Sequence, residues 1–364
     1  MTAPIVALAV SGHGFGHAVR CAEVARALTD VGARTIVRTD APRWLFPETV
    51  EHLPSPGWPL DVGVAQHDGL DLDVDETRRR WAAFADAFDA RADAEAQLLA
   101  EHRVAVVLGD IPPLVFAAAS RANVPGVALA NFGWDWIYAE WPNFDRAVNT
   151  VRGGYRHAEM LLRLPLHSPD ADAFCSFETI EDVPLIARRA QHTRCQVRAQ
   201  LGLDQQAPVV LLSFGGFTAH GLDVQALGRW RDYTFVLTPP MSSTTAALPD
   251  NVLMLAQAPT DYTSLLAACD VVVTKPGYGV VADCLANRVS VLYTDRGPFR
   301  EYDVLTQALA TLGRARHVPR ADVLGGQLGP HLDALLASSV NWTTQDLDGA
   351  QCVARRLLEF IQEK

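Results

Sequence analysis

The sequence lacks any pair of cysteines in a CxxC arrangement, although it contains six cysteines among its 364 residues. Two cysteines at that spacing are a common signature of a bound metal or a redox-active dithiol, so neither is indicated. Isolated cysteines suit a reducing compartment, where disulfides are rare. We therefore expect a cytoplasmic protein with free thiols.

An excess of positive charge is also missing, since the formal net charge is −11 at pH 7. Broad nucleic-acid binding depends on basic surfaces, so we expect no nucleic-acid partner, although a local basic pocket for a phosphate stays open. No apolar stretch reaches the length of a membrane span, and no basic segment precedes the first apolar run. We therefore expect no integral membrane segment and no signal peptide.

What the sequence does contain is a repeated alternation of short apolar runs and helix-like segments. Short buried strands alternating with helices predict an α/β fold, in which helices cover both faces of a parallel sheet. In the first half the expected strands are residues 5–10, 35–38, 50–53, 104–108, 126–130 and 161–164. The expected helices there are residues 17–30, 78–102 and 113–122.

A second series of the same kind follows a zone of mixed charge at residues 167–207. Its expected strands are residues 209–213, 233–238, 252–255, 270–274 and 290–293, and its expected helices are 221–230, 261–269, 279–287 and 301–312. Two successive series of similar size predict two Rossmann-like, doubly wound domains, which we place at residues 1–185 and 186–345. Apolar residues at helical spacing predict a further helix over residues 346–364.

The segment SGHGFGHAVR, residues 11–20, joins the first strand to the first helix. It lacks the third glycine of a dinucleotide fingerprint and the lysine of a phosphate-binding loop, so neither motif is indicated. An anion site at the helix start remains open. The segment does contain two histidines, His13 and His17. Neutral imidazole titrates near physiological pH, which makes each a candidate general base on a hydroxyl group.

Other polar residues fall at the same expected sheet edge, where parallel sheets bind ligands. Asp110 ends a strand, and a buried carboxylate there could hold the Nδ1 proton of His17. The loop of residues 131–138 places Asp135 between two tryptophans, Trp134 and Trp136. Two interpretations of this loop stay open: an aromatic wall for an acceptor molecule, or a packed aromatic loop.

The second half repeats the strand–glycine turn–helix pattern in TKPGYGVVAD, residues 274–283. Backbone N–H groups in such a turn can bind a diphosphate, helped by the helix dipole. We expect this role for the turn residues Gly277, Tyr278 and Gly279 and for the charge of Lys275. Asp283 either binds the hydroxyls of a ribose or only compensates the helix dipole.

Three further sets complete the candidate nucleotide site. Gly215 and Gly216 follow the strand at 209–213 and are expected to approach the nucleotide. A polar loop after the strand at 290–293 offers Asp295 and Glu301 to a donor sugar, although both could be plain loop charge. The base edge is expected at Gln257 and Ala258. The alternating acids Asp71, Asp73 and Asp75 are read as loop charge, so we expect no metal site.

These motifs, taken together, resemble the GT-B glycosyltransferases, and most closely the glycosyltransferase-like N-terminal region of plant L-arabinokinases. The matching segments are spread over most of the chain, at residues 12–20, 131–140, 163–165, 182–189, 213–216 and 277–286. The resemblance implies two Rossmann-like domains with a cleft between them and a C-terminal helix that packs back on the first domain.

The resemblance also implies roles for single residues. It makes His17 the base, assigns Asp110 to orient it, and places the turn with Gly14 and Phe15 against the reacting sugar and acceptor. It assigns the ribose to Asp283, although the family usually carries glutamate there. The usual Asp/Glu-Gln pair that reads the donor sugar stands here as Glu301-Tyr302, so the donor is not implied.

We therefore expect a metal-independent glycosyltransferase that needs no cofactor besides its co-substrate. It would move a sugar from a nucleotide-sugar, with a UDP-linked donor expected, to the hydroxyl of an unidentified acceptor. Two alternatives stay open: a nucleotide-sugar hydrolase, because residues 16–21 match a GHxxRC segment of such an enzyme, and a non-catalytic module that binds sugar nucleotides. The sequence does not predict the oligomeric state.

Overall fold

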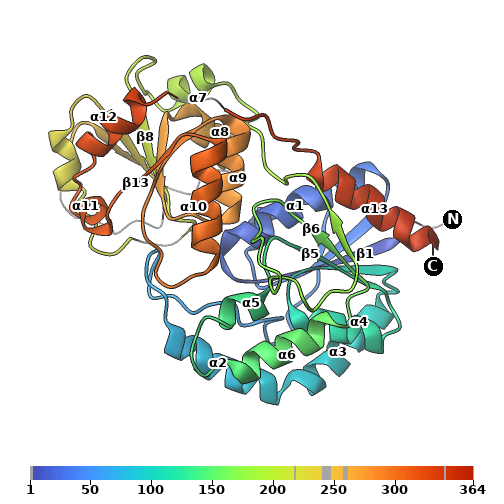
Figure 1. Cartoon of the computed structure of the whole chain (residues 1–364). Helices are drawn as coiled ribbons and strands as arrows, with labels where there is room; N and C mark the ends of the chain where they lie inside the picture. Colours follow the sequence, from blue (N-terminus) through green and yellow to red (C-terminus); the bar gives the residue numbers. More distant parts are fainter. Residues whose placement is uncertain (1–2, 217–218, 240–246, 257–260, 340–341, 364) are drawn as a thin grey trace. The chain divides into compact units, whose positions relative to one another are not determined.

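The computed structural model describes residues 3–216, 219–239, 247–256, 261–339 and 342–363 (Figure 1). The chain forms two compact units. The first unit consists of Met1–Ala65, Asp73–Ile186 and Asp346–Lys364, and the second of Gln66–Leu72 and Ala187–Gln345. Each unit is built on its own parallel sheet, as the alternating pattern of the sequence predicted.

The sheet of the first unit has seven strands in the order β3-β2-β1-β4-β5-β6-β7. The strands are β1 (Ile5–Val10), β2 (Arg34–Arg38), β3 (Glu51–His52), β4 (Val106–Asp110), β5 (Gly126–Ala130), β6 (Met160–Arg163) and β7 (Ile180–Asp182). All neighbouring strands are parallel, and β1 pairs with β4 so that Val10 lies opposite Asp110. Strands β4 and β5 are buried along their whole length, which explains their uninterrupted apolar sequences.

Helices cover both faces of this sheet: α1 and α13 lie on one side, and α3, α4 and α6 on the other (Figure 1). The helices of the unit are α1 (Gly14–Asp30), α2 (Val74–Asp86), α3 (Phe88–Glu101), α4 (Pro113–Arg121), α5 (Trp134–Tyr138), α6 (Asp145–Tyr155) and α13 (Gly349–Glu363), with a 3₁₀ turn at Arg43–Leu45. The single helix expected over residues 78–102 was wrong, because the chain breaks at Ala87 into α2 and α3.

The C-terminal helix α13 belongs to the first unit, where it packs on α1. Its buried face carries Val353, Ala354 and Leu357, each fully buried. On its outer side Arg356 donates two hydrogen bonds, of 2.9 and 3.0 Å, to the carboxylate of Glu181 in β7. Gly349 starts the helix so close to the backbone that an added Cβ would lie 2.2 Å from the carbonyl oxygen of Pro184.

The sheet of the second unit has six strands in the order β10-β9-β8-β11-β12-β13. They are β8 (Val209–Leu212), β9 (Thr234–Leu237), β10 (Val252–Met254), β11 (Val271–Thr274), β12 (Ser290–Tyr293) and β13 (Ala315–His317). The helices are α7 (Arg194–Gln200), α8 (Tyr262–Ala268), α9 (Tyr278–Asn287), α10 (Glu301–Leu312), α11 (Arg320–Leu324) and α12 (Gly329–Ala337). Where a helix was expected over 221–230, only a 3₁₀ segment forms, Gln225–Arg229.

One short segment joins the second unit from a distant place in the sequence. Residues Gln66–Leu72 lie between β3 and α2 in the chain, yet the side chain of Leu70 is buried in the core of the second unit. Asp71 forms an ion pair with Arg320, and Nζ of Lys275 donates to Oε1 of Gln66 at 3.3 Å. The expected division of the chain at residues 185 and 186 did not anticipate this exchange.

No helix in the described part of the chain combines the length and the apolar character that a membrane crossing requires.

Candidate functional site

The first candidate site lies at the carboxyl ends of β1 and β4 in the first unit. After β1 the backbone N–H of Ser11 bonds to the carbonyl oxygen of Asp110 at 3.0 Å, and helix α1 begins at Gly14, whose φ is +70°. A positive φ is easily adopted only by glycine, which explains this residue at the turn. The helix starts three residues earlier than expected, so His17 lies in the first turn of α1 rather than at its first residue.

The side chains of His17 and Asp110 touch. The Nδ1 atom of His17 lies 2.8 Å from Oδ1 of Asp110, and both side chains are buried. Burial would raise the pKa of Asp110, but the positive charge of Arg20 and the neighbouring His17 outweigh it and hold that pKa well below its ordinary value. Asp110 is therefore a carboxylate fixed against the ring of His17, an arrangement that suits a base and its orienting acid.

Two further residues complete this cluster and were not singled out from the sequence. Arg20 donates from Nε to Oδ2 of Asp110 at 2.5 Å and from Nη2 to Oδ1. Its Nη1 atom donates to Oδ1 of Asn131 at 2.7 Å. A signal was present, because Arg20 follows His17 by three residues, which places both on the same side of a helix.

A second buried acid, Asp61, lies close to this cluster. Nε1 of Trp134 donates to its Oδ2 at 3.0 Å. Burial raises the pKa of Asp61 to about 6, against the opposing effects of a hydrogen bond from Ser11 and the charge of His17. Asp61 stands in an irregular segment between β3 and α2, so neither periodicity nor a motif marked it in the sequence.

The pKa of Asp61 predicts a pH-dependent effect of the substitution Asp61→Asn. A raised pKa means that the folded protein holds a proton that the unfolded chain releases, so Asp61 lowers stability as the pH rises towards and through 6. Relative to the wild type, the free energy of unfolding of D61N should therefore increase by about 2 kcal/mol between pH 4.5 and pH 8. Urea denaturation at both values measures this. The exposed control D75N should show no such increase, and a flat difference for D61N would contradict the assignment.

The aromatic loop after β5 is packed rather than open. Trp134 is fully buried, and Asp135, which is 1% exposed, has its Oδ2 3.3 Å from both Nε of Arg152 and the hydroxyl of Ser176. The expectation that these two residues form a wall for an acceptor is therefore not what the structure shows. Of the two interpretations of this loop, the packed aromatic loop is the one its burial supports.

The other residues expected at this site lie in the same turn. Nδ1 of His13 accepts a hydrogen bond from the backbone of Val64 at 3.2 Å, and the ring packs edge-on against Trp134. Gly14 and Phe15 are half-buried, and the ring of Phe15 contacts Trp44, whose side chain is 59% exposed. His13 is thus held by its Nδ1 atom.

The second candidate site lies at the carboxyl ends of β8 and β11 in the second unit. These strands pair in parallel, with Val273 opposite Leu212, so the turns that follow them share one edge of the sheet. Gly215 and Gly216 both have positive φ, +69° and +82°. Gly277 precedes α9, and a Cβ atom added to it would meet no other atom within 4 Å.

Two buried basic side chains, Lys275 and Arg296, lie beside the turn at Gly277. Burial, with the charge of Arg296 adding to it, lowers the pKa of Lys275 well below its ordinary value. Arg296 was not singled out from the sequence; its Nη1 atom lies 3.3 Å from both the carbonyl oxygen of Pro276 and Oε2 of Glu301. Arg296 thus brings a guanidinium to the turn where a diphosphate was expected, whereas burial disfavours the charged form of Lys275.

The residues expected at the donor sugar lie in different surroundings. Glu301 is buried at the start of α10, and its carboxylate pairs with Arg296, so it is more than plain loop charge. Asp295 is exposed, and its carboxylate lies 2.9 Å from Nε2 of His317. Gln257 and Ala258, expected at the base, lie outside the described residues.

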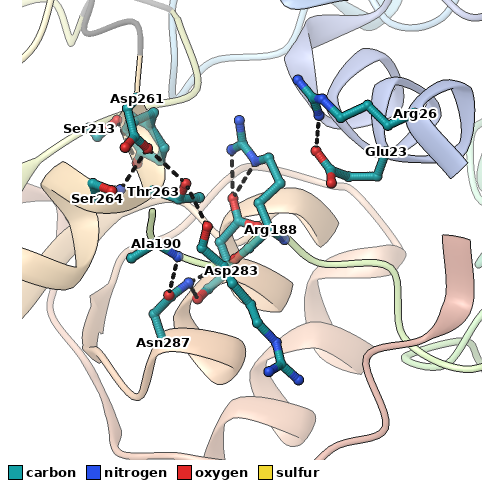
Figure 2. Close-up of polar contacts among 12 residues, drawn as sticks. Glu23, Arg26, Arg188, Ala190, Ser213, Asp261, Thr263, Ser264, Asp283 and Asn287 are labelled. Carbon is teal, nitrogen blue, oxygen red and sulfur yellow. Dashed lines mark hydrogen bonds and ion pairs between the residues drawn. The ribbon is translucent and has the colours of Figure 1, made fainter. Parts of the chain in front are cut away.

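The carboxylate of Asp283 accepts hydrogen bonds from Arg188, a residue of the same unit (Figure 2). The backbone N–H of Arg188 donates to its Oδ1 at 2.9 Å, while the guanidinium donates to its Oδ2 from Nε at 3.1 Å and from Nη2 at 2.6 Å. One turn along α9, Asn287 bonds to the backbone of Arg188 and of Ala190. These contacts fasten the segment that enters the second unit onto α9, and they compete with the expected ribose contact.

The substitution Asp283→Asn separates these two roles. If Asp283 is an internal anchor, D283N should lower the free energy of unfolding by about 2 kcal/mol, because the substitution removes the buried carboxylate that pairs with Arg188. The affinity for UDP should then change less than about threefold. Urea denaturation and calorimetric titration measure both, with Arg188→Gln as the matched variant. Unchanged stability together with a tenfold loss of UDP affinity, absent for 2′-deoxy-UDP, would instead support the ribose contact.

The acids that were read as loop charge have structural partners. Asp73 caps α2 by accepting a hydrogen bond from the backbone of Glu76 at 2.8 Å, and Asp75 pairs with Arg78 in the first turn of the same helix. Among the residues that the structure describes, no group of three or more His, Cys, Asp or Glu side chains is arranged to hold a metal ion.

Comparison with known structures identifies the fold. UGT89C1 of Arabidopsis thaliana, solved with quercetin, aligns over 99% of this chain and 96% of its own, with a TM-score of 0.64 and 16% identity. The glycosyltransferase SnogD of Streptomyces nogalater aligns over 98% of this chain and 99% of its own, with a TM-score of 0.61 and 16% identity. This chain has the GT-B fold. The resemblance of its motifs to GT-B glycosyltransferases is thereby confirmed at the level of the fold.

A sequence relative supports the resemblance to L-arabinokinases that the motifs indicated. The chain is 31% identical over 338 residues to the L-arabinokinase of Arabidopsis thaliana, and the match covers 90% of this chain. It covers only 32% of the relative, so the chain spans about a third of that protein's length. No family model matches the sequence.

Proposed function

We propose that this protein is a glycosyltransferase that uses a nucleotide-sugar, with UDP as the nucleotide, and His17 as the base. The contact between His17 and Asp110 carries the proposal, because it provides an imidazole oriented by a buried carboxylate. The GT-B neighbours support it: UGT89C1 has been solved with UDP-L-rhamnose and with UDP. The acceptor stays unidentified.

In the proposed reaction the acceptor hydroxyl gives its proton to Nε2 of His17 as its oxygen attacks the anomeric carbon of the sugar. The bond from that carbon to the diphosphate breaks, and its electron pair leaves with the diphosphate. Backbone N–H groups at the start of α9, beside Gly277, would stabilise the developing charge together with Arg296, and Lys275 would donate a hydrogen bond to the diphosphate. Charge on the leaving group would thus be balanced by residues of the chain itself, without a metal ion.

A panel of UDP- and dTDP-sugars, incubated with the protein with and without a small-molecule cell extract, tests this function. Release of UDP that depends on the extract, with a new glycoside in the mass spectrum, is the expected result. Release of free sugar without any acceptor would make the protein a hydrolase. Tight binding of the nucleotide without release in either case would make it a binding module.

A further inference from the structure

We propose that Arg20 is a positioning residue that acts through Asp110 to keep His17 neutral and its Nε2 atom free to accept a proton. The inference rests on the proposed function of His17 as a base. Its support is geometric: Arg20 is 3% exposed, and its guanidinium bonds to both oxygens of Asp110 and to the side chain of Asn131.

Two groups compete for the Nδ1 atom of His17. Oδ1 of Asp110 lies 2.8 Å from it, and Nη2 of Arg20 lies 3.1 Å from it. If Nδ1 carries a proton it donates to Asp110, and Nε2 is the bare nitrogen. If Nδ1 is bare it accepts from Arg20, and Nε2 carries the proton and cannot act as a base. Arg20 favours the first arrangement, with the proton on Nδ1. Its two hydrogen bonds to Asp110 keep this carboxylate ionised and fix its Oδ1 atom closer to Nδ1 than the Nη2 atom of Arg20 lies.

The charges around His17 show what else Arg20 contributes. Two carboxylates face the imidazole, Asp110 from β4 and Asp61 from the segment before α2. Arg20 faces it from its own helix, and the thiol of Cys21, which donates to Oδ2 of Asp110 at 3.2 Å, stays neutral because burial raises its pKa. Without Arg20, the imidazole would face two negative charges and no positive one. Arg20 offsets one of these negative charges, so its removal should favour the protonated form of the imidazole.

Changes at the two partners should therefore move the titration of His17 in opposite directions. Arg20→Gln removes the positive charge and should raise the titration midpoint of His17 by about one pH unit. Asp110→Asn removes the negative charge and should lower it. Arg20→Lys keeps the positive charge but loses the pair of hydrogen bonds that the planar guanidinium donates to the two oxygens of Asp110. The titration midpoint of His17 should therefore stay within about 0.3 pH units of the wild-type value, while kcat falls about tenfold because Asp110 is held less firmly. A purely structural role for Arg20 would not move the midpoint.

Nuclear magnetic resonance of the full chain measures this titration directly, from the ¹³Cε1 shifts of the histidines. The His17 signal is assigned by its loss in His17→Gln, among the eleven histidines of the chain. An upward shift in R20Q together with an unchanged midpoint in R20K supports the proposal. An unchanged or lowered midpoint in R20Q would overturn it.

The wild-type protein provides a second measurement, which decides the matter even if R20Q does not fold. Above its midpoint, the ¹⁵N shifts of His17 should show a protonated Nδ1 and a bare Nε2. The opposite tautomer would mean that Arg20 donates to Nδ1, and the proposal would be wrong. Neither measurement requires turnover, so the two proposals can fail separately. If the expected shifts appear but the protein transfers no sugar, only the proposed function is rejected. If the protein transfers sugar but the shifts do not appear, only this inference is rejected.

Discussion

Replacing His17 with glutamine should lower kcat by about a thousandfold while the affinity for UDP changes less than about threefold. Glutamine keeps a polar side chain of similar length, but it cannot accept a proton from a hydroxyl at neutral pH. His17 belongs to the first unit and touches Asp110 there, whereas the residues proposed to bind the diphosphate belong to the second unit. Steady-state rates and calorimetric titration with UDP measure the two quantities.

The exposed His157, two residues after the end of α6 in the same unit, provides the matched control. His157→Gln should leave both kcat and the UDP affinity unchanged. A His17→Gln enzyme with most of its activity would reject the role of this residue as the base. A loss of UDP affinity as large as the loss of rate would show that the substitution had damaged the fold or the nucleotide site.

Replacing Gly277 with valine should reduce the affinity for UDP by about 30-fold without lowering the melting temperature appreciably. The φ of Gly277 is −148°, an extended conformation that valine adopts readily, and an added Cβ would meet no protein atom within 4 Å. The fold therefore tolerates the side chain, but a diphosphate bound against the backbone N–H groups of this turn would meet it. Losing such charge-assisted contacts costs about 2 kcal/mol.

Gly153, in α6, gives the matched control, because a Cβ added there also meets no atom within 4 Å. Gly153→Val should leave the UDP affinity unchanged, and it should not destabilise α6, because valine has a higher helix propensity than glycine. Unchanged affinity in Gly277→Val, measured by calorimetric titration, would place the diphosphate elsewhere.

The sequence predicted the parts of the site that depend on sheet geometry. The apolar runs at β1 and β4 indicated two buried parallel strands, and polar residues that follow such strands gather at one edge of the sheet. For this reason Asp110 could be proposed as a partner of His17, and the structure shows that the two side chains touch. The same rule correctly brought the turns after β8 and β11 to one edge of the second sheet.

Contacts that do not follow from the order of the strands could not be predicted. Asp61 lies in an irregular segment, and Asp283 meets a partner 95 residues away in Arg188. The tryptophans near Asp135 gave no sign of their burial, because composition cannot tell a packed aromatic loop from an exposed one. The proximity of Arg20 to His17 could have been predicted, since a spacing of three residues places both side chains on the same side of α1.

The proposed reaction requires the donor bound by the second unit to meet an acceptor at His17. A crystal structure of the protein with an intact UDP-sugar measures this most directly, through the distance from Nε2 of His17 to the anomeric carbon. If one hydroxyl oxygen bridges the two atoms, that distance is about 6 Å or less, and the diphosphate lies on the backbone at Gly277. A diphosphate bound away from Gly277, or an anomeric carbon well beyond the reach of one hydroxyl group, would contradict the account.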